Sequence, residues 1–212
     1  MTAAPFSAER EEVAAAGRTL AEHGLVTGTA GNVSLRAGAG RAITPAGADL
    51  TEVRAQDIVV VTETGELLEG DGRPSSETPL HLSVDAPAIV HTHSHFATVL
   101  SCFNEDVLPV HYLMARFGGP LRVAPYATFG TPDLAAAATE GLRDRTAVLL
   151  ANHGAVVVGE TLSEALDRAA LLESSCAIAY HARILGGPRV LSSVELAEVS
   201  GAETAASVGE QR

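Results

Sequence analysis

Apolar residues recur along the chain at two spacings, one typical of helices and one typical of strands. Helical spacing over residues 7–24 and 163–185 predicts two amphipathic helices, the first with Ser7 as its N-cap and Gly24 at its end. Shorter helices are predicted over residues 78–84 and 94–102 and from Pro132 onward.

Short apolar runs between turn residues predict strands. Val33 and Leu35 alternate with polar residues, and a glycine turn at 38–40 leads into a second run at 41–44, which predicts a hairpin. Further strands are predicted at residues 58–62, 88–93, 122–127, 148–151 and 155–159. Strands that come singly, in pairs and next to helices are typical of an α/β or α+β fold with a mixed sheet.

A single domain is predicted, because neither a linker nor an internal repeat divides the 212 residues. We expect this domain to span residues 1–198, and we expect the small, polar segment 199–212 to be a disordered tail. A hydrophobic content of 46% with only 19% charged residues is typical of a soluble globular protein rather than a disordered one.

Charge and cysteine content narrow the classes of partner. A net charge of −12 argues against nucleic acid, because phosphate neutralisation needs a basic face. The apolar runs are too short to span a bilayer and the chain opens without a secretory signal, so no membrane partner is expected. Cys102 and Cys176 lie far apart in apolar contexts and are expected to be reduced core residues of a cytoplasmic protein.

The chain contains no lysine, and all 14 of its cationic side chains are arginine. A mechanism that needs a Schiff base to an enzyme lysine is therefore excluded. If this protein stabilises a carbanion next to a carbonyl, a metal ion must take up the negative charge.

Three histidines have the spacing of a metal site. His91 and His93 follow the apolar run 88–90, and side chains two apart on a strand point to the same face. His153 closes a second apolar run and could converge from a neighbouring strand end. A lone histidine here would more simply be a polar strand-end residue bonded to backbone. The combination of H-x-H with N-H-G favours a catalytic metal with three protein ligands.

Several turns offer groups that could bind an anion. The turn at residues 28–32 contributes backbone amides with the side chains of Thr29 and Asn32, and the turn at 44–47 adds Gly47. Ser75 and Ser76 supply two further hydroxyls. Together these groups could hold a phosphate without lysine, although each segment alone is also explained by ordinary turn chemistry.

Glu77 and Tyr112 are the candidate acid and base groups. Glu77 precedes a predicted helix, where a carboxylate is favoured by the helix dipole alone, but beside a metal it becomes a candidate general base or fourth ligand. Tyr112 is a candidate proton donor, or else an ordinary half-buried aromatic. The remaining histidines have no matching spacing and are expected to be structural or surface residues, namely His23, His81, His95, His111 and His181.

The order of these motifs, G-T-A-G-N-x-S, I-T-P-x-G, S-S-E, H-x-H, H-Y and N-H-G, resembles that of the class II aldolase/epimerase (adducin-like) family. The resemblance runs from Leu20 to about Ser193. The stretches His111-Tyr112 and 124–131 are most similar to the L-fuculose-1-phosphate aldolase branch.

This resemblance implies a three-layer α/β/α fold around a mixed, largely antiparallel sheet. It implies zinc, with Mn²⁺, Co²⁺ or Fe²⁺ as alternatives, held by His91, His93 and His153, with Glu77 as acid/base and resting ligand. It implies a phosphate site formed by Thr29, Asn32, Gly47, Ser75 and Ser76. Tyr112 would act across a subunit interface in a homotetramer.

The activity that the resemblance implies is reversible cleavage of a deoxy-ketose 1-phosphate, of the fuculose 1-phosphate type, to dihydroxyacetone phosphate and a short aldehyde. Alternatives on the same scaffold are a sugar-phosphate 4-epimerase, a methylthioribulose-1-phosphate dehydratase and a 3-oxo-acid phosphate decarboxylase, and a further one is a non-catalytic adducin-type domain. The chain departs from the family pattern in two ways. Ala46 stands where the family has a threonine, and the C-terminal segment lacks a tyrosine. We therefore expect weaker phosphate binding and a differently shaped aldehyde pocket.

Overall fold

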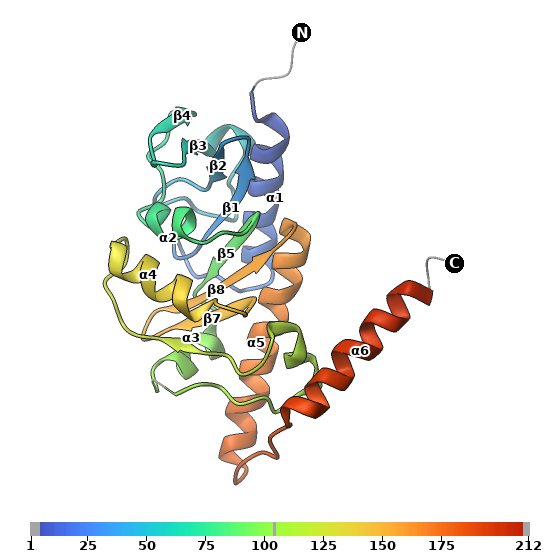
Figure 1. The fold of residues 1–212 in the computed structure, drawn as a ribbon. Coiled ribbons are helices and arrows are strands. Elements are labelled where there is room, and N and C mark those ends of the chain that lie inside the picture. The colour runs from blue at the N-terminus through green and yellow to red at the C-terminus, as the bar shows by residue number, and fades with distance from the viewer. Residues whose placement is uncertain (1–4, 104, 210–212) are drawn as a thin grey trace.

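The computed structural model describes residues 5–103 and 105–209, and its centre is a single eight-stranded sheet (Figure 1). Neighbouring strands follow the order β4-β3-β2-β1-β5-β8-β7-β6, and every pair is antiparallel except β6 with β7. The strands are β1 (Asn32–Ala37), β2 (Gly40–Ile43), β3 (Val59–Thr62), β4 (Leu67–Glu69), β5 (Ala88–Thr92), β6 (Val123–Ala124), β7 (Ala147–Leu150) and β8 (Gly154–Gly159). The predicted mixed, largely antiparallel sheet is confirmed.

Helices cover both faces of this sheet and complete three layers (Figure 1). One face carries α1 (Ser7–Glu22), α3 (His95–Ser101) and α5 (Leu162–Ile184), and the other carries α2 (Thr78–Ser83) and α4 (Pro132–Gly141). Two 3-10 helices, η1 (Ala55–Asp57) and η2 (Tyr112–Phe117), lie in the connections, and α6 (Ser193–Gly209) follows α5.

The side chains of β5 point alternately to the two faces of the sheet, so this strand contributes to the core on both sides. Ala88 and Val90 pack into the core beneath α1 and α5, whereas Ile89 packs into the core beneath α2 and α4. All five residues of β5 are buried, as expected for a central strand covered on both faces. His91 therefore points to the same side as Ile89, toward α2.

Most predicted elements are present, and their ends differ by a few residues. The hairpin is confirmed, with Leu35 opposite Ala42. Helix α4 has Thr131 as N-cap, whose side chain accepts a hydrogen bond from the Leu134 amide. The prediction of Ser7 as an N-cap is wrong: Ser7 is already helical, and the N-cap is Phe6 at φ 57°.

The prediction that both cysteines are core residues holds only for Cys176. Its side chain lies fully buried on α5, and burial raises the pKa of its thiol. Cys102 is exposed, because it is the C-cap residue of the short helix α3, which buries Ala97, Leu100 and Ser101 instead.

Helix α6 crosses the boundary at residue 198 that the sequence predicted for the domain. It continues to Gly209 through a segment rich in alanine, a strong helix former, and residues 210–212 lie outside the described residues. The helix projects away from the body beside η2 (Figure 1). Within the described part of the chain, no helix is both long and apolar enough to cross a membrane.

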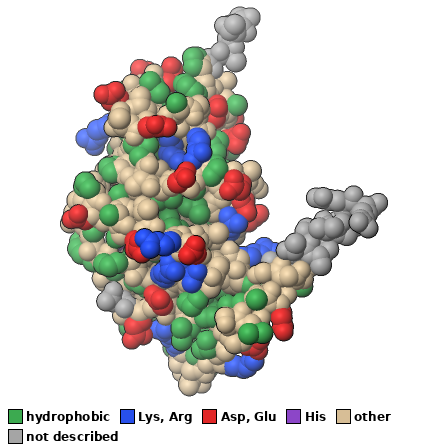
Figure 2. Space-filling model, viewed as in Figure 1, with side chains coloured by type: hydrophobic (Ala, Val, Ile, Leu, Met, Phe, Trp, Pro, Cys, Tyr) green, Lys and Arg blue, Asp and Glu red, His purple; other side chains and the backbone are tan. Residues whose placement is uncertain are grey.

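Acidic side chains and arginines are interspersed over the face of the molecule shown in Figure 2. Hydrophobic side chains are scattered between them on that face.

Candidate metal centre

Three strand ends bring the predicted histidines together. His91 is the fourth residue of β5, His93 follows the end of this strand, and His153 lies in the tight turn between β7 and β8. Because β8 pairs directly with β5, with Thr92 opposite Ala155, this turn lies next to the end of β5. The ring centroids of the three histidines are 4.7–4.9 Å apart, so the rings converge on one point.

Glu77 completes a group of four potential ligands. One ligand atom from each of Glu77, His91, His93 and His153 lies within 4.8 Å of all the others. Glu77 Oε2 is 3.1 Å from His91 Nε2, and Glu77 Oε1 is 3.5 Å from His153 Nε2. His91 Nε2 and His93 Nε2 are 2.9 Å apart. Lone pairs at such distances repel one another unless a cation or a proton lies between them, so the donor set fits a divalent metal.

The protein backbone fixes the orientation of His91. Its Nδ1–H donates to the backbone carbonyl of Ala155 at 2.9 Å, which leaves the Nε2 lone pair directed at the other ligands. Gly154 permits this close packing, because a Cβ on that residue would lie 2.2 Å from the carbonyl oxygen of Thr92.

The turn that carries His153 is held in an uncommon backbone conformation. Asn152 has φ 55°, in the left-handed region, which asparagine tolerates better than most residues. The Asn152 amide donates to the Ser101 carbonyl at 3.3 Å, which connects the turn to the end of α3. This conformation lets the chain reverse direction between two paired strands and directs His153 toward the cleft.

Glu77 is held in place by its backbone position at the start of α2 and by one side-chain hydrogen bond. It occupies the N-cap position of α2, and it is 5% exposed. The side-chain amide of Asn32 donates to Glu77 Oε2 at 2.8 Å, whereas buried Oε1 has no hydrogen-bond partner among the described residues. An unpartnered carboxylate oxygen facing three imidazoles is a suitable ligand for a cation.

The electrostatic environment favours an ionised Glu77 carboxylate and neutral rings of His93 and His153. Burial by itself raises the pKa of Glu77, but His91, the hydrogen bond from Asn32 and His153 together hold this pKa below its ordinary value. Burial, together with His91 and His153, lowers the pKa of His93 to about 4. The pKa of His153 is lowered by burial and by His91. His93 is therefore available as a neutral ligand near pH 7.

An open cleft of about 340 Å³ leads to this group of residues. All five residues predicted to bind phosphate line it, namely Thr29, Asn32, Gly47, Ser75 and Ser76. Glu77, His93 and His153 line the same cleft, whereas fully buried His91 lies behind them. The structure therefore places the predicted metal ligands and the predicted anion-binding groups in one continuous site.

Tyr112 is the one predicted site residue that the structure brings neither to the group of metal ligands nor to the cleft. It begins η2, is 52% exposed and contacts the ring of His111. Its side chain is absent from the residues that line the cleft of its own chain.

The comparisons with known proteins agree with this geometry. Residues 11–180 match the family described as Class II Aldolase and Adducin N-terminal domain. The chain belongs to this family. With its three histidines and Glu77 in one group, the protein is a metal-dependent class II aldolase, a lyase.

Known proteins similar to this class II aldolase match it over most of its length. A 5-deoxy-D-ribulose 1-phosphate aldolase of Bacillus thuringiensis serovar kurstaki is 40% identical over 89% of this chain and 92% of its own. A 5-methylthioribulose-1-phosphate/5-deoxyribulose-1-phosphate aldolase of Rhodospirillum rubrum is 38% identical over 87% of this chain and 86% of its own. Among solved structures, an L-fuculose 1-phosphate aldolase superposes with a TM-score of 0.89 at 37% identity, covering 93% of this chain and 97% of its own.

Two groups of residues at this aldolase site were not identified as functional from the sequence. Tyr126, Phe129 and Asn152 line the cleft, although the motifs 124–131 and N-H-G that contain them were used only for the family resemblance and for His153. His81, expected to be a structural or surface residue, is fully buried and bonds to Asn32. Its position four residues after Glu77 on a predicted helix could have indicated that the two side chains share a face.

Proposed function

We propose that this class II aldolase reversibly cleaves a short deoxy-ketose 1-phosphate to dihydroxyacetone phosphate and an aldehyde. The observation that carries the proposal is the convergence of Glu77, His91, His93 and His153 at a cleft lined by hydroxyl groups and backbone turns. The chain has no lysine for a Schiff base, so the charge that develops beside the ketone must be stabilised in another way.

Zinc is the metal that we propose, held by the three histidines with Glu77 as a ligand in the resting state. Three neutral imidazoles and a carboxylate suit zinc, and manganese, cobalt or iron(II) are alternatives with similar ligand preferences. When bound, such an ion supplies Lewis-acid stabilisation of the negative charge on the ketone and hydroxyl oxygens.

Two side chains of the protein carry out the proton transfers. In the direction of synthesis, Glu77 removes a proton from C3 of dihydroxyacetone phosphate, and the electron pair left at C3 attacks the aldehyde carbon. Tyr112 of a neighbouring subunit donates a proton to the aldehyde oxygen, which becomes the C4 hydroxyl. Cleavage runs the same steps backward. The proposal of a neighbouring subunit, in a homotetramer, is supported by the position of Tyr112 outside the cleft of its own chain.

The phosphate group would bind where the hydroxyls and amides cluster. Thr29, Ser75 and Ser76 offer hydroxyls, and the turn at Gly47 offers backbone N–H groups. Glycine at position 47 has φ 71°, a conformation that leaves the backbone open to close approach by a ligand. Asn32 can contribute its second amide N–H, because only one is used by Glu77.

The relatives support a deoxy-ketose 1-phosphate as the class of substrate, but they do not single out one compound of that class. Two of them act, by their names, on 5-deoxyribulose 1-phosphate and cover 89% and 87% of this chain, whereas an L-fuculose phosphate aldolase of Escherichia coli is 39% identical over 68% of it. A 3-oxo-tetronate 4-phosphate decarboxylase of Haemophilus influenzae, 34% identical over 82% of the chain, makes decarboxylation the second candidate.

Product analysis on zinc-loaded protein tests the proposal. The protein is incubated with L-fuculose 1-phosphate, 5-deoxyribulose 1-phosphate or 5-methylthioribulose 1-phosphate, and released dihydroxyacetone phosphate is coupled to NADH oxidation. We expect release that stops on chelation and returns with zinc. If the metal-loaded protein releases no dihydroxyacetone phosphate from any of these substrates, the aldolase proposal is contradicted. Release of carbon dioxide from a 3-oxo-acid phosphate would favour the decarboxylase.

A further inference from the structure

A buried chain of hydrogen bonds runs from Arg41 to Glu77 beneath helix α2. Arg41 donates to Ser34 Oγ at 3.2 Å, and Ser34 Oγ lies 2.6 Å from His81 Nδ1. His81 Nε2 is bonded to Asn32 Oδ1, and the Asn32 amide donates to Glu77 Oε2 at 2.8 Å. Each of these five side chains is buried.

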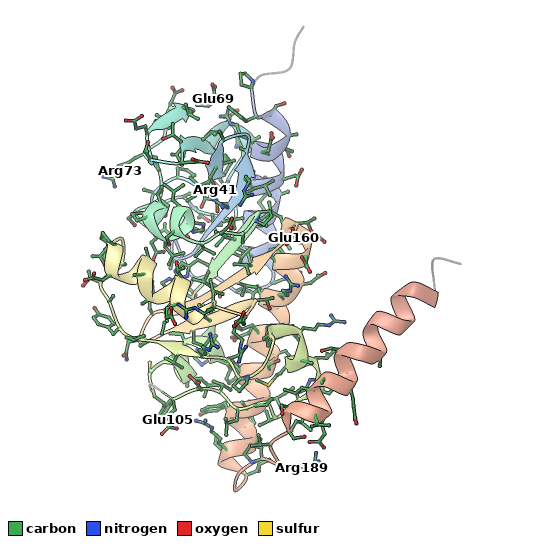
Figure 3. The ribbon with its side chains drawn as sticks, viewed as in Figure 1. Arg41, Glu69, Arg73, Glu105, Glu160 and Arg189 are labelled. Atoms are coloured by element: carbon green, nitrogen blue, oxygen red, sulfur yellow. The ribbon has the colours of Figure 1, made fainter. Side chains whose placement is uncertain are left out.

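Strand register explains why these residues meet. Asn32 and Ser34 are two apart on β1, and Ser34 lies opposite Ile43 of β2, two residues beyond Arg41. All three side chains therefore point to the face of the sheet that α2 covers. His81 lies on α2 four residues after Glu77, so both of these side chains point from the helix toward the sheet. Figure 3 shows Arg41 inside the body near β1, unlike the other labelled charged residues, which lie at the periphery.

The two ends of the chain fix its direction. A guanidinium can only donate, and an ionised carboxylate can only accept. Ser34 accepts from Arg41, so its own hydrogen is free to go to His81 Nδ1. The Asn32 amide N–H is directed at Glu77, so its carbonyl oxygen must accept from His81 Nε2. His81 therefore carries a proton on Nε2, and as a neutral ring it accepts from Ser34 through Nδ1.

Arg41 is anchored by backbone rather than by an acid. It also donates to the carbonyl oxygens of Ala86 at 2.7 Å and Pro87 at 3.2 Å, whereas the nearby Asp85 pairs with Arg36. Burial, with Arg41 and His91, lowers the pKa of His81 to about 3, in agreement with a neutral ring.

We propose that His81 is a positioning residue for Glu77. As the Nε2–H tautomer it orients the Asn32 side chain, so that the Asn32 amide N–H and not its carbonyl oxygen meets the carboxylate. Without this donor the Asn32 amide loses the constraint that decides which of its two ends faces Glu77. This role rests on the proposed function, in which Glu77 moves the proton at C3.

Substitutions of His81 in the zinc-loaded enzyme test this role kinetically. His81→Leu removes both ring nitrogens, whereas His81→Gln keeps an amide N–H that can donate to Asn32. Exposed His181 provides a matched control in His181→Leu. The measurements are kcat and KM for cleavage, exchange of the C3 hydrogen of dihydroxyacetone phosphate with deuterium from solvent, zinc content and thermal unfolding.

We expect His81→Leu to bind zinc and unfold cooperatively, yet to lose about 10- to 100-fold in kcat and in C3 exchange, the range typical of residues that orient a catalytic group. KM should change far less, His81→Gln should recover most of the rate, and His181→Leu should match the wild type. Unchanged kcat in His81→Leu, or a loss confined to KM, would overturn the proposal.

A second measurement does not depend on activity or on the stability of a variant. Nitrogen-15 NMR of the histidine rings in zinc-loaded wild-type protein should show His81 as the neutral Nε2–H tautomer. A ring protonated on Nδ1, or on both nitrogens, would overturn the proposal. If the wild type neither cleaves substrates nor exchanges the C3 hydrogen, the proposed function fails, and the NMR result still decides the direction of the hydrogen-bond chain.

Discussion

The Oε2 atom of Glu77 lies 3.1 Å from Nε2 of His91, and the same oxygen accepts a hydrogen bond from Asn32. Asn32 is also the residue directly opposite His91 in the pairing of β1 with β5. The register of β1 against β5 therefore places the candidate metal ligand His91 beside Asn32, the side chain that orients the candidate acid–base group Glu77.

Replacing Glu77 with glutamine should remove the proton transfer while keeping the side-chain volume. We expect cleavage to fall by about 10²- to 10⁴-fold, the range typical for loss of a general acid or base. Three histidines remain in Glu77→Gln, so zinc should still bind, which is checked by metal analysis of the purified variant. Wild-type rates of C3 exchange in this variant would exclude Glu77 as the base.

Removing one histidine should weaken metal binding and abolish activity together. His153→Ala leaves two imidazoles, so we expect substoichiometric zinc after dialysis and loss of cleavage that excess zinc only partly restores. His181→Ala is the control, because His181 is exposed and bonds to the Ala177 carbonyl of its own helix. Full zinc content in His153→Ala would show that His153 is not a ligand.

If Tyr112 acts in the site of a neighbouring subunit, two inactive variants should complement each other. Tyr112→Phe and Glu77→Gln should each be inactive as pure oligomers. When they are dissociated together and reassembled, about a quarter of the sites in a randomly mixed oligomer receive an intact Glu77 and an intact Tyr112 from different chains. Mixtures that stay inactive while exchanging subunits would mean that Glu77 and Tyr112 of one chain serve the same site. Wild-type activity of pure Tyr112→Phe would remove Tyr112 from the reaction.

Restoring a hydroxyl at position 46 should strengthen phosphate binding. Ala46 lines the cleft beside Gly47, where a threonine would supply one further donor. A typical hydrogen bond contributes about 1 kcal/mol, so we expect Ala46→Thr to lower KM for the phosphorylated substrate about fivefold with kcat unchanged. An unchanged KM would mean that the phosphate lies away from this turn.

Buried His81 should make the fold sensitive to acid. Its pKa is lowered from 6.5 to about 3 by burial, Arg41 and His91, so between these values the unfolded chain binds a proton that the folded protein does not. The stabilising contribution is present above pH 6.5 and is lost as the pH falls. Lowering the pH from 7 to 5 should cost about 2 kcal/mol through this residue.

Urea unfolding of metal-free wild type and His81→Gln at pH 7 and pH 5 measures this contribution. Carboxylates titrate in both proteins, so the difference between the two pH effects isolates His81. Equal losses of unfolding free energy in the two proteins would mean that His81 is protonated in the folded state or accessible to water.

The sequence by itself determined the parts whose signals are local. Alternation at Val33 and Leu35 with glycines at 38 and 40 was sufficient for the hairpin, because side-chain period and turn chemistry both act over a few residues. The two-residue spacing of His91 and His93 at the end of an apolar run was sufficient for two of the candidate ligands. The absence of lysine excluded one chemistry without reference to any fold.

Only the tertiary structure decided which distant residues meet. Asn32, predicted solely as an anion-binding residue, also holds Glu77, and His81 lies in the chain of bonds behind it, because β1, β5 and α2 pack together. The exposure of Cys102 and the position of Tyr112 outside its own cleft likewise depend on packing between layers. Local pattern fixes the spacing of side chains along an element, whereas burial and hydrogen-bond partners follow from contacts between residues far apart in the chain.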